Sequence, residues 1–378
     1  MTHNGRQIAI NTGGGDAPGL NAVIHGAVYA ARGLGWKIFG IRDGYDGLLE
    51  PQQYPEGGLV ELHRSTVRDI AHLGGTILGT VNRGNPLRRP TVQSDGTVCE
   101  LDRTAELIQS FRDHGLDALI AVGGDGSLTI ARCLQQRGLC VVGVPKTIDN
   151  DLQATVMTFG FNSAVSFATE CIDRLHSTAL SHRRIMVVEV MGRYAGWIAL
   201  HCGIAGHADA ILIPEIPYEI ERVAAHLKRK HQYGKPYSIV VVAEGAKPLG
   251  GHVTARAGAP GQVERLGGIG EIVSKQLEQL TGKESRVVVL GHLLRGGSPT
   301  AIDRNLGLSF GAGAVHALAQ GMNGVMVALQ PPHLAFVPLE EATAHLKLVP
   351  PDAEGVLVAR ALDISFGDRW ESQLAAAS

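Results

Sequence analysis

The sequence predicts an α/β protein of two doubly wound, Rossmann-like parallel-sheet domains, with the active site in the cleft between them. Apolar runs of strand length alternate with segments whose apolar residues recur at helical spacing along most of the chain. The 378 residues exceed the usual size of a single hydrophobic core. The 49 glycines are many for this length and suit α/β units whose function lies in strand-to-helix turns. Such sheets bind ligands at the carboxyl ends of their strands, which favours a cleft.

Strands and helices are expected to alternate from the N-terminus onward. A strand at 7–10, a helix through 22–30 and a strand at 36–41 form a βαβ unit, which implies a right-handed crossover and parallel strands. Residues 50–100 are irregular, with loops and a small hairpin. Further strands are expected at 116–122, 139–144, 185–190, 210–214, 237–243, 286–290 and 325–329. Further helices are expected at 104–114, 162–179, 219–230, 269–280 and 302–320.

Charge and cysteine content exclude several classes of protein. The 34 Lys and Arg residues nearly balance the 36 Asp and Glu residues, so no nucleic-acid or membrane-surface partner held mainly by charge is expected. No apolar run is long enough to span a bilayer. The five cysteines are scattered without a CxxC pair, which argues against a zinc site or a disulfide framework. Because the N-terminus also lacks the apolar region of a signal peptide, we expect a cytoplasmic protein.

The turn at residues 122–127, Val-Gly-Gly-Asp-Gly-Ser, lies between an apolar strand and an amphipathic helix, with Ser127 as the expected N-cap. Backbone amides and the positive end of the helix converge at such a turn and bind anions. The glycines allow a phosphate to approach the backbone, and Asp125 supplies a carboxylate for a Mg²⁺ that bridges to it. The alternative is a tight structural turn with a capping aspartate.

Another glycine turn, Gly13-Gly14-Gly15-Asp16, follows the first strand and is here termed the first glycine turn. It lacks the lysine of a P-loop and the spacing of a dinucleotide fingerprint. Two interpretations of this turn therefore remain, a phosphate-binding loop and a purely structural turn.

The segment 147–151, Thr-Ile-Asp-Asn-Asp, leaves an apolar strand and is expected at the functional edge of its sheet. If it is extended, Thr147, Asp149 and Asp151 share one face. A hydroxyl and two carboxylates suit the binding and deprotonation of an alcohol, and phosphoryl transfer needs little more than such a base, a metal and good positioning. The alternative is an acidic surface loop with an Asx turn.

Four arginines stand at strand ends. Arg193 and Arg295 follow strands, whereas Arg184 and Arg286 precede or begin them. Any one of them is better explained by a solvated ion pair, but the four together, in a chain of near-zero net charge, suggest an anion pocket. Because strand starts and strand ends lie at opposite edges of a sheet, Arg184 and Arg286 are expected to reach a neighbouring subunit. Glu244 also ends a strand, and either a sugar hydroxyl or an ion pair would suit it.

Five motifs stand in the order found in the 6-phosphofructokinase family: GGGDAPGLN, GGDGS, PKTIDND, VVEVMGRYAGW and VLGHLLRGGSP. Over nearly its whole length the chain therefore resembles that family. The resemblance implies an ATP-dependent enzyme of glycolysis that uses Mg²⁺ to phosphorylate the 1-hydroxyl of D-fructose 6-phosphate, yielding fructose 1,6-bisphosphate. A pyrophosphate-dependent enzyme, or a kinase of a related sugar phosphate such as sedoheptulose 7-phosphate, remains the alternative.

The resemblance also implies an organisation. Residues 1–160 plus 295–329 would form the domain for the nucleotide or phosphoryl donor, and residues 161–294 plus 330–378 the sugar-phosphate domain. A homo-oligomer, either a dimer or a tetramer, is expected. Two rival hypotheses are another GGDG kinase, acting on NAD or a lipid, and a catalytically silent nucleotide-binding subunit. The TIDND segment and the arginine-bearing second domain argue against the first, and the complete set of acids and arginines argues against the second.

The family implies a role for each matching residue. Gly15 would contact the nucleotide phosphates, Asp125 would bind Mg²⁺, and Asp149 would activate the sugar hydroxyl. The phosphate loop would comprise Gly124, Asp125, Gly126 and Ser127. Thr147 and Arg193 would assist catalysis, and Arg83 would stabilise the transferring phosphoryl group. The other expected substrate-binding residues are Ile148, Asp151, Arg184, Met191, Gly192, Glu244, Arg286, His292, Leu293, Leu294 and Arg295.

Two positions bear on the donor. In the family, an aspartate in place of Gly126 is associated with pyrophosphate use, because it crowds and repels the nucleotide α-phosphate. Glycine leaves that space open, so ATP is expected. Lys146 resembles the lysine of pyrophosphate-using members, and the combination resembles the mixed subgroup. His25 and Tyr29 stand where allosteric bacterial members have arginines, which argues against regulation by ADP or phosphoenolpyruvate.

Overall fold

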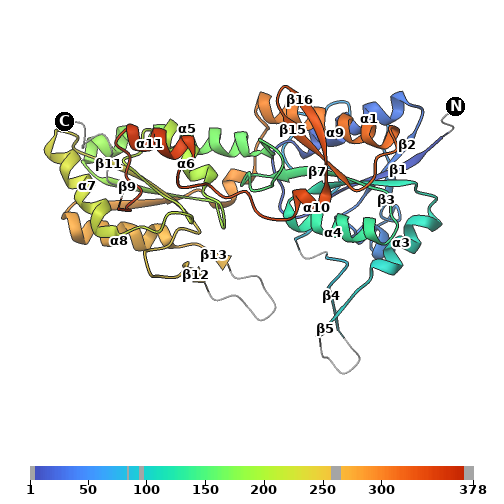
Figure 1. The fold of residues 1–378 in the computed structure, drawn as a ribbon, viewed down its shortest axis with the longest axis horizontal. Coiled ribbons are helices and arrows are strands. Elements are labelled where there is room, and N and C mark those ends of the chain that lie inside the picture. The colour runs from blue at the N-terminus through green and yellow to red at the C-terminus, as the bar shows by residue number, and fades with distance from the viewer. Residues whose placement is uncertain (1–4, 83–84, 93–97, 257–264, 370–378) are drawn as a thin grey trace. The chain divides into compact units, whose positions relative to one another are not determined.

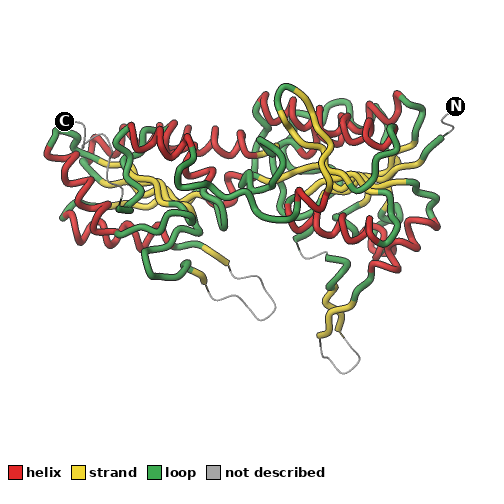
Figure 2. The backbone as a smooth tube through the Cα atoms, viewed as in Figure 1, coloured by secondary structure: helices red, strands yellow, loops and turns green. Residues whose placement is uncertain are grey.

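The computed structural model describes residues 5–82, 85–92, 98–256 and 265–369. The chain divides into two compact units. The first unit comprises Met1–Ser163 and Arg295–Leu346, and the second comprises Ala164–Leu294 and Lys347–Ser378. Each unit contains a mostly or wholly parallel sheet with helices packed on it (Figures 1 and 2). The predicted fold class, mostly parallel α/β sheets, is confirmed.

The first unit has an eight-stranded sheet in the order β16-β15-β7-β6-β1-β2-β3, with β8 paired to β7. Its parallel strands are β1 (Gln7–Thr12), β2 (Lys37–Ile41), β6 (Ala118–Gly123), β7 (Val141–Thr147), β8 (Phe159–Gly160) and β15 (Val325–Gln330). The edge strands β3 (Leu59–Glu61) and β16 (His333–Pro338) are antiparallel to their neighbours. Because β16 pairs with β15, residues 330–346 lie in the first unit, and their expected place in the second domain is wrong.

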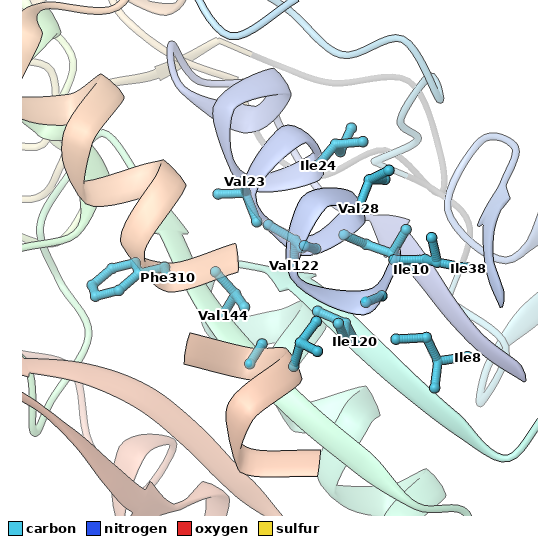
Figure 3. Packing of buried hydrophobic residues seen from close by; sticks show 14 of the residues in the cluster. Ile8, Ile10, Val23, Ile24, Val28, Ile38, Ile120, Val122, Val144 and Phe310 are labelled. Carbon is cyan, nitrogen blue, oxygen red and sulfur yellow. The ribbon is translucent and has the colours of Figure 1, made fainter. Parts of the chain in front are cut away.

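Alternate residues of the central strand β1 pack on opposite faces of this sheet, as its period of two requires. Ile8 and Ile10 join one hydrophobic layer, and Ala9 joins the other. The first layer is covered by α1 and α9, and Figure 3 shows its Ile and Val side chains gathered beside Phe310 of α9. The helices of this unit are α1 (Leu20–Gly33), α2 (Asp46–Leu49), η1 (Pro51–Gln53), α3 (Thr104–Asp113), α4 (Asp125–Gln136), α9 (Ala301–Ala319) and α10 (Leu339–Ala342).

Helices α1 and α9 approach one another closely because glycines remove side chains from their contact. A Cβ on Gly26 would collide with the backbone of Leu308, and one on Gly311 would collide with the carbonyl of Val23.

A small antiparallel hairpin lies outside the main sheet. Its strands β4 (Arg89–Val92) and β5 (Val98–Leu101) pair as the hairpin expected between residues 50 and 100 (Figure 1).

The second unit has a four-stranded, wholly parallel sheet in the order β10-β11-β9-β14. These strands are β9 (Ile185–Val190), β10 (Ala210–Leu212), β11 (Ser238–Ala243) and β14 (Ser285–Val289). A two-residue ladder joins β12 (Ala255–Arg256) to β13 (Arg265–Leu266). The helices are α5 (Phe161–His182), which begins in the first unit, α6 (Trp197–Ala205), α7 (Ile220–Gln232), α8 (Ile269–Thr281), η2 (Gly291–Arg295) and α11 (Glu354–Ala361). Among the described residues, no helix has the length and apolar content needed to cross a membrane.

Candidate active site

The turn between β6 and α4 positions Asp125 and Gly126. The N-cap of α4 is Gly124, and the helix begins at Asp125, so the prediction that Ser127 is the N-cap is wrong. A carboxylate in the first helical turn is stabilised by the helix dipole, which favours this earlier start. Ser127 instead packs on the first glycine turn, where a Cβ on Gly13 would lie 2.8 Å from its hydroxyl.

Gly126 faces open space. A Cβ added there would have no heavy atom within 4 Å, so the backbone of this turn is accessible to a ligand. A Cβ on Gly124 would instead lie 3.2 Å from the carbonyl of Lys146, which leaves that position tighter.

Two carboxylates influence one another beside this turn. Burial raises the pKa of Asp125, the charge of Asp151 raises it further, and Arg132 acts in the opposite direction. A nearby cation would favour the ionised form of both acids. The described residues contain no group of three or more His, Cys, Asp or Glu that could hold a metal ion by itself. Asp125, in the first turn of α4 beside the open position of Gly126, fits Mg²⁺, which is commonly bound by one or two carboxylates together with substrate phosphates.

Strand β7 ends in a buried lysine. Lys146 is 4% exposed, and its Nζ donates a hydrogen bond to the carbonyl oxygen of Gly15. Burial and the neighbouring Arg295 lower the pKa of Lys146 to about 8, against the opposing charges of Asp16, Asp149 and Asp151. An ammonium group thus lies among three carboxylates next to the first glycine turn.

The segment 147–151 turns immediately after β7. The Thr147 hydroxyl accepts a hydrogen bond of 3.0 Å from the backbone N–H of Asp149, and Asn150 has a positive φ of 52°. The expectation of an extended segment with alternating faces is therefore wrong, because this local hydrogen bond favours a turn. Asp149 and Asp151 nonetheless both act on the charge of Lys146. Ile148 is fully buried, so the structure does not support it as a ligand contact.

Arg295 lies against the first glycine turn. Its guanidinium donates a 3.2 Å hydrogen bond to the carbonyl of Asp16. A Cβ on Gly15 would lie 2.7 Å from the same guanidinium, so a side chain there would displace Arg295. Thr80 also holds this turn, since its hydroxyl donates a 2.6 Å bond to the carbonyl of Gly14.

The sequence argument overlooked Asp16 and Thr80 as neighbours of the site. Asp16 carried a signal, because it is the only charged residue of the GGGDAPGLN motif. Thr80 carried none. Arg83, which was expected to act on the transferring phosphoryl group, lies outside the described residues.

In the second unit, three turns follow the carboxyl ends of neighbouring strands. Met191, Gly192 and Arg193 follow β9, Glu244 follows β11, and His292, Leu293 and Leu294 follow β14. The first two turns contact one another through their backbones, since Gly245 donates a 3.1 Å bond to the carbonyl of Gly192.

The side chains at this edge differ in accessibility. Leu293 is 62% exposed, whereas Leu294 is 1% exposed and belongs to the core. The Arg193 guanidinium lies 5.2 Å from the centre of the Tyr194 ring. Both residues line a cavity of about 530 Å³ within this unit, together with Glu215, Gly245 and Lys247 and several prolines.

Arg184 and Arg286 lie at the opposite edge of the same sheet. Arg184 immediately precedes β9, and Arg286 pairs in register with Met186 near the start of that strand. Both arginines bind Glu284: Arg184 donates a 2.6 Å bond, and Arg286 forms an ion pair with the other carboxylate oxygen. Arg286 nevertheless remains half exposed.

Comparison with known proteins identifies similar chains and folds. The family model described as Phosphofructokinase matches residues 7–318. The ATP-dependent 6-phosphofructokinase of Chloroflexus aurantiacus is 51% identical over 368 residues, which cover 97% of this chain and 99% of that protein. The pyrophosphate–fructose 6-phosphate 1-phosphotransferase of Amycolatopsis methanolica is 49% identical over 353 residues, which cover 92% and 97% of the two chains. The crystal structure of Pichia pastoris phosphofructokinase in the T-state superposes with a TM-score of 0.77 at 31% identity, covering 95% of this chain and 36% of that longer chain.

Proposed function

The chain belongs to the phosphofructokinase family, and on that premise we propose that it is an ATP-dependent 6-phosphofructokinase. It is a phosphotransferase that moves the terminal phosphoryl group of ATP to the 1-hydroxyl of fructose 6-phosphate. The observation that carries this conclusion is 51% identity to an ATP-dependent 6-phosphofructokinase over 97% of the chain. The family resemblance inferred from the five motifs is thereby confirmed.

The choice of ATP as donor is supported by Gly126. Space around this glycine is open in the first turn of α4, where a nucleotide phosphate would approach the helix N-terminus. Pyrophosphate is the second candidate donor, because a relative of 49% identity uses it by name and because Lys146 supplies a buried cation beside Gly15. Gly15 would approach the donor phosphates through its backbone.

Mg²⁺ is proposed as the metal, with Asp125 as its carboxylate ligand. When bound, the ion would neutralise charge on the donor phosphates. The electrostatic coupling of Asp125 to Asp151 supports this proposal, since two neighbouring carboxylates gain from a cation between or beside them. Gly124 and Ser127 would complete the phosphate loop.

Asp149 is proposed as the general base. It would accept the proton of the 1-hydroxyl while the sugar oxygen attacks the terminal phosphorus and ADP departs. Lys146 favours the ionised carboxylate, because an ammonium close to Asp149 stabilises its negative charge. Thr147 and Asp151 would orient the hydroxyl. Arg193 would act with Arg83 on the charge of the transferring group.

The 6-phosphate is proposed to bind arginines from more than one subunit. Arg295 and His292 would serve within a subunit, and Arg184 and Arg286 would reach a neighbour's site in a homo-oligomer. The exposure of Arg286 at the edge opposite Arg193 supports this division. The sugar itself would contact Met191, Gly192, Glu244 and Leu293, whereas Ile148 and Leu294 are buried and are not proposed as contacts.

A coupled assay tests the function directly. Purified protein is given Mg²⁺, ATP or pyrophosphate, and either fructose 6-phosphate or sedoheptulose 7-phosphate. We expect fructose 1,6-bisphosphate with the highest kcat/KM for ATP and fructose 6-phosphate. Failure to phosphorylate fructose 6-phosphate with either donor would refute the proposed function. A clear preference for pyrophosphate would refute ATP as the donor and assign pyrophosphate in its place.

A further inference from the structure

Asp303 is a buried carboxylate that no part of the proposed chemistry uses. It is the third residue of α9 and has no exposed surface. Its Oδ2 accepts a 2.7 Å hydrogen bond from the backbone N–H of Ser163 and a 2.6 Å bond from the Ser163 hydroxyl. A carboxylate is costly to bury unless its hydrogen bonds are made. The two Ser163 donors satisfy Oδ2, whereas Oδ1 is buried without a hydrogen-bond partner among the described residues, and burial raises the pKa of Asp303.

The contact is reciprocal. The Ser163 hydroxyl accepts a 2.9 Å bond from the backbone N–H of Thr300, and the Thr300 hydroxyl donates a 2.7 Å bond to the side-chain oxygen of Asn162. Thr300 is also the N-cap of α9, accepting from the N–H of Asp303. The side chains of Asn162, Ser163, Thr300 and Asp303, here termed the Asp303 network, thus satisfy N–H groups at the starts of both α5 and α9.

Three segments of the candidate active site meet at this network. Strand β8 immediately precedes α5, and its two residues pair with Lys146 and Thr147 at the end of β7. Arg295 lies five residues before Thr300 and contacts the first glycine turn. A Cβ on Gly19, at the end of the GGGDAPGLN motif, would lie 3.4 Å from the backbone carbonyl of Asp303.

The network also includes the residue at which the chain leaves the first unit, and Thr300 lies five residues after the point at which it re-enters. Ser163 is the last residue of the unit before the first crossing, and Arg295 is the first residue after the return. The hydrogen bonds of Ser163 to Thr300 and Asp303 therefore join the segment by which the chain leaves the first unit to the segment by which it returns.

We propose that Asp303 is a positioning residue for phosphoryl transfer: it joins the β8–α5 junction to the segment 295–300, so that Arg295 and the segment 146–149 keep their places around the transferred group. This inference rests on the proposed function. Asp303 touches no substrate and acts through Arg295 and through the strand that pairs with Lys146 and Thr147. Loss of the Asp303 charge would weaken its hydrogen bonds from Ser163. The β8–α5 junction and the segment 295–300 could then move independently of one another.

The primary test is Asp303→Asn, assayed with ATP and fructose 6-phosphate. A small displacement of catalytic groups costs up to about 10²-fold in rate, so we expect kcat/KM to fall roughly tenfold to a hundredfold. The matched control is Asp102→Asn. Asp102 likewise accepts from both the N–H and the hydroxyl of one residue, Thr104, at the start of α3, at 2.9 and 2.5 Å. The Asp102→Asn variant should be less stable than wild type, while its kcat/KM stays within about twofold of the wild-type value.

A double-mutant cycle separates positioning from a purely structural role. If Asp303 acts partly through Arg295, then Asp303→Asn costs a smaller factor in kcat/KM when Arg295→Ala is already present than it costs in wild type. Independent, multiplicative losses would overturn the proposal, and so would wild-type kinetics in Asp303→Asn. Should that variant fail to fold, Ser163→Ala removes only the hydroxyl from the network and is expected to show the same loss of kcat/KM in milder form.

Amide hydrogen exchange gives a readout that is independent of activity. Peptides covering 159–163 and 295–303 should exchange faster in Asp303→Asn than in wild type, even if the substrate were misassigned. Faster exchange without loss of activity would show that the network holds the fold and positions nothing. If wild type itself fails to phosphorylate fructose 6-phosphate, the proposed function fails first, and with it the positioning role.

Discussion

Gly126→Asp is the substitution that best tests the basis of donor choice. Because no heavy atom lies within 4 Å of a Cβ at this position, the aspartate side chain fits without displacing the protein. The new carboxylate would lie in the first turn of α4, where the helix dipole stabilises it by ~0.3–1 kcal/mol. Folding should therefore be unimpaired, so that any kinetic effect reports on the donor.

The expected magnitude follows from charge repulsion. Two unit charges ~5 Å apart at an effective dielectric of ~20 repel by about 3 kcal/mol. That energy corresponds to a loss of about 10²-fold in kcat/KM for ATP. Pyrophosphate lacks the α-phosphate and the nucleoside, so its kcat/KM should change much less.

Two further variants separate charge from bulk. Gly126→Asn has nearly the same shape without the charge, and Gly126→Ala adds only the Cβ that the open space accommodates. The alanine variant should remain within about threefold of wild type, and the asparagine variant should lie between alanine and aspartate. Kinetics with each donor at saturating fructose 6-phosphate provide the measurement. An aspartate variant with unchanged kcat/KM for ATP, or an alanine variant as poor as aspartate, would refute the reasoning.

Three other variants lead to four expected outcomes. Asp149→Ser should lower kcat by ~10²–10⁴-fold while calorimetry shows little change in fructose 6-phosphate binding; near-normal turnover would remove Asp149 as the base. Lys146→Met should lower pyrophosphate-supported kcat/KM by about 10–100-fold and ATP-supported kcat/KM less. The pKa of Lys146 is lowered from 10.5 to about 8, so the unfolded chain holds more protons between these pH values, and wild-type stability should rise with pH across that window relative to Lys146→Met in chemical denaturation. Glu284→Gln should release Arg184 and Arg286 and lower the KM for fructose 6-phosphate in saturation kinetics, and an unchanged KM would indicate that Glu284 does not compete with the substrate.

The strands and glycine turns were predictable because their signals are local. Buried parallel strands need continuous apolar runs, and the turns after β1 and β6 need glycine where backbones or side chains come close. The edge strand β16 was missed because its apolar run at 334–337 is only four residues long and lies between prolines, and residues 330–346 were consequently assigned to the wrong domain. The helix start at Asp125 and the turn after Thr147 were also predicted incorrectly, since in each case one local hydrogen-bonding or dipole effect outweighed the general pattern.

The amino-acid sequence by itself determined the family, the α/β class and the acids at the carboxyl ends of β6 and β7, because motif order and strand patterning depend on residues close together in the chain. Only the tertiary structure decided that Arg295 contacts the turn at Asp16, 279 positions away, and that Asp303 binds Ser163, 140 positions away. Contacts of that range depend on how packed helices and strands bring distant backbone groups together. No local preference of the residues involved specifies them.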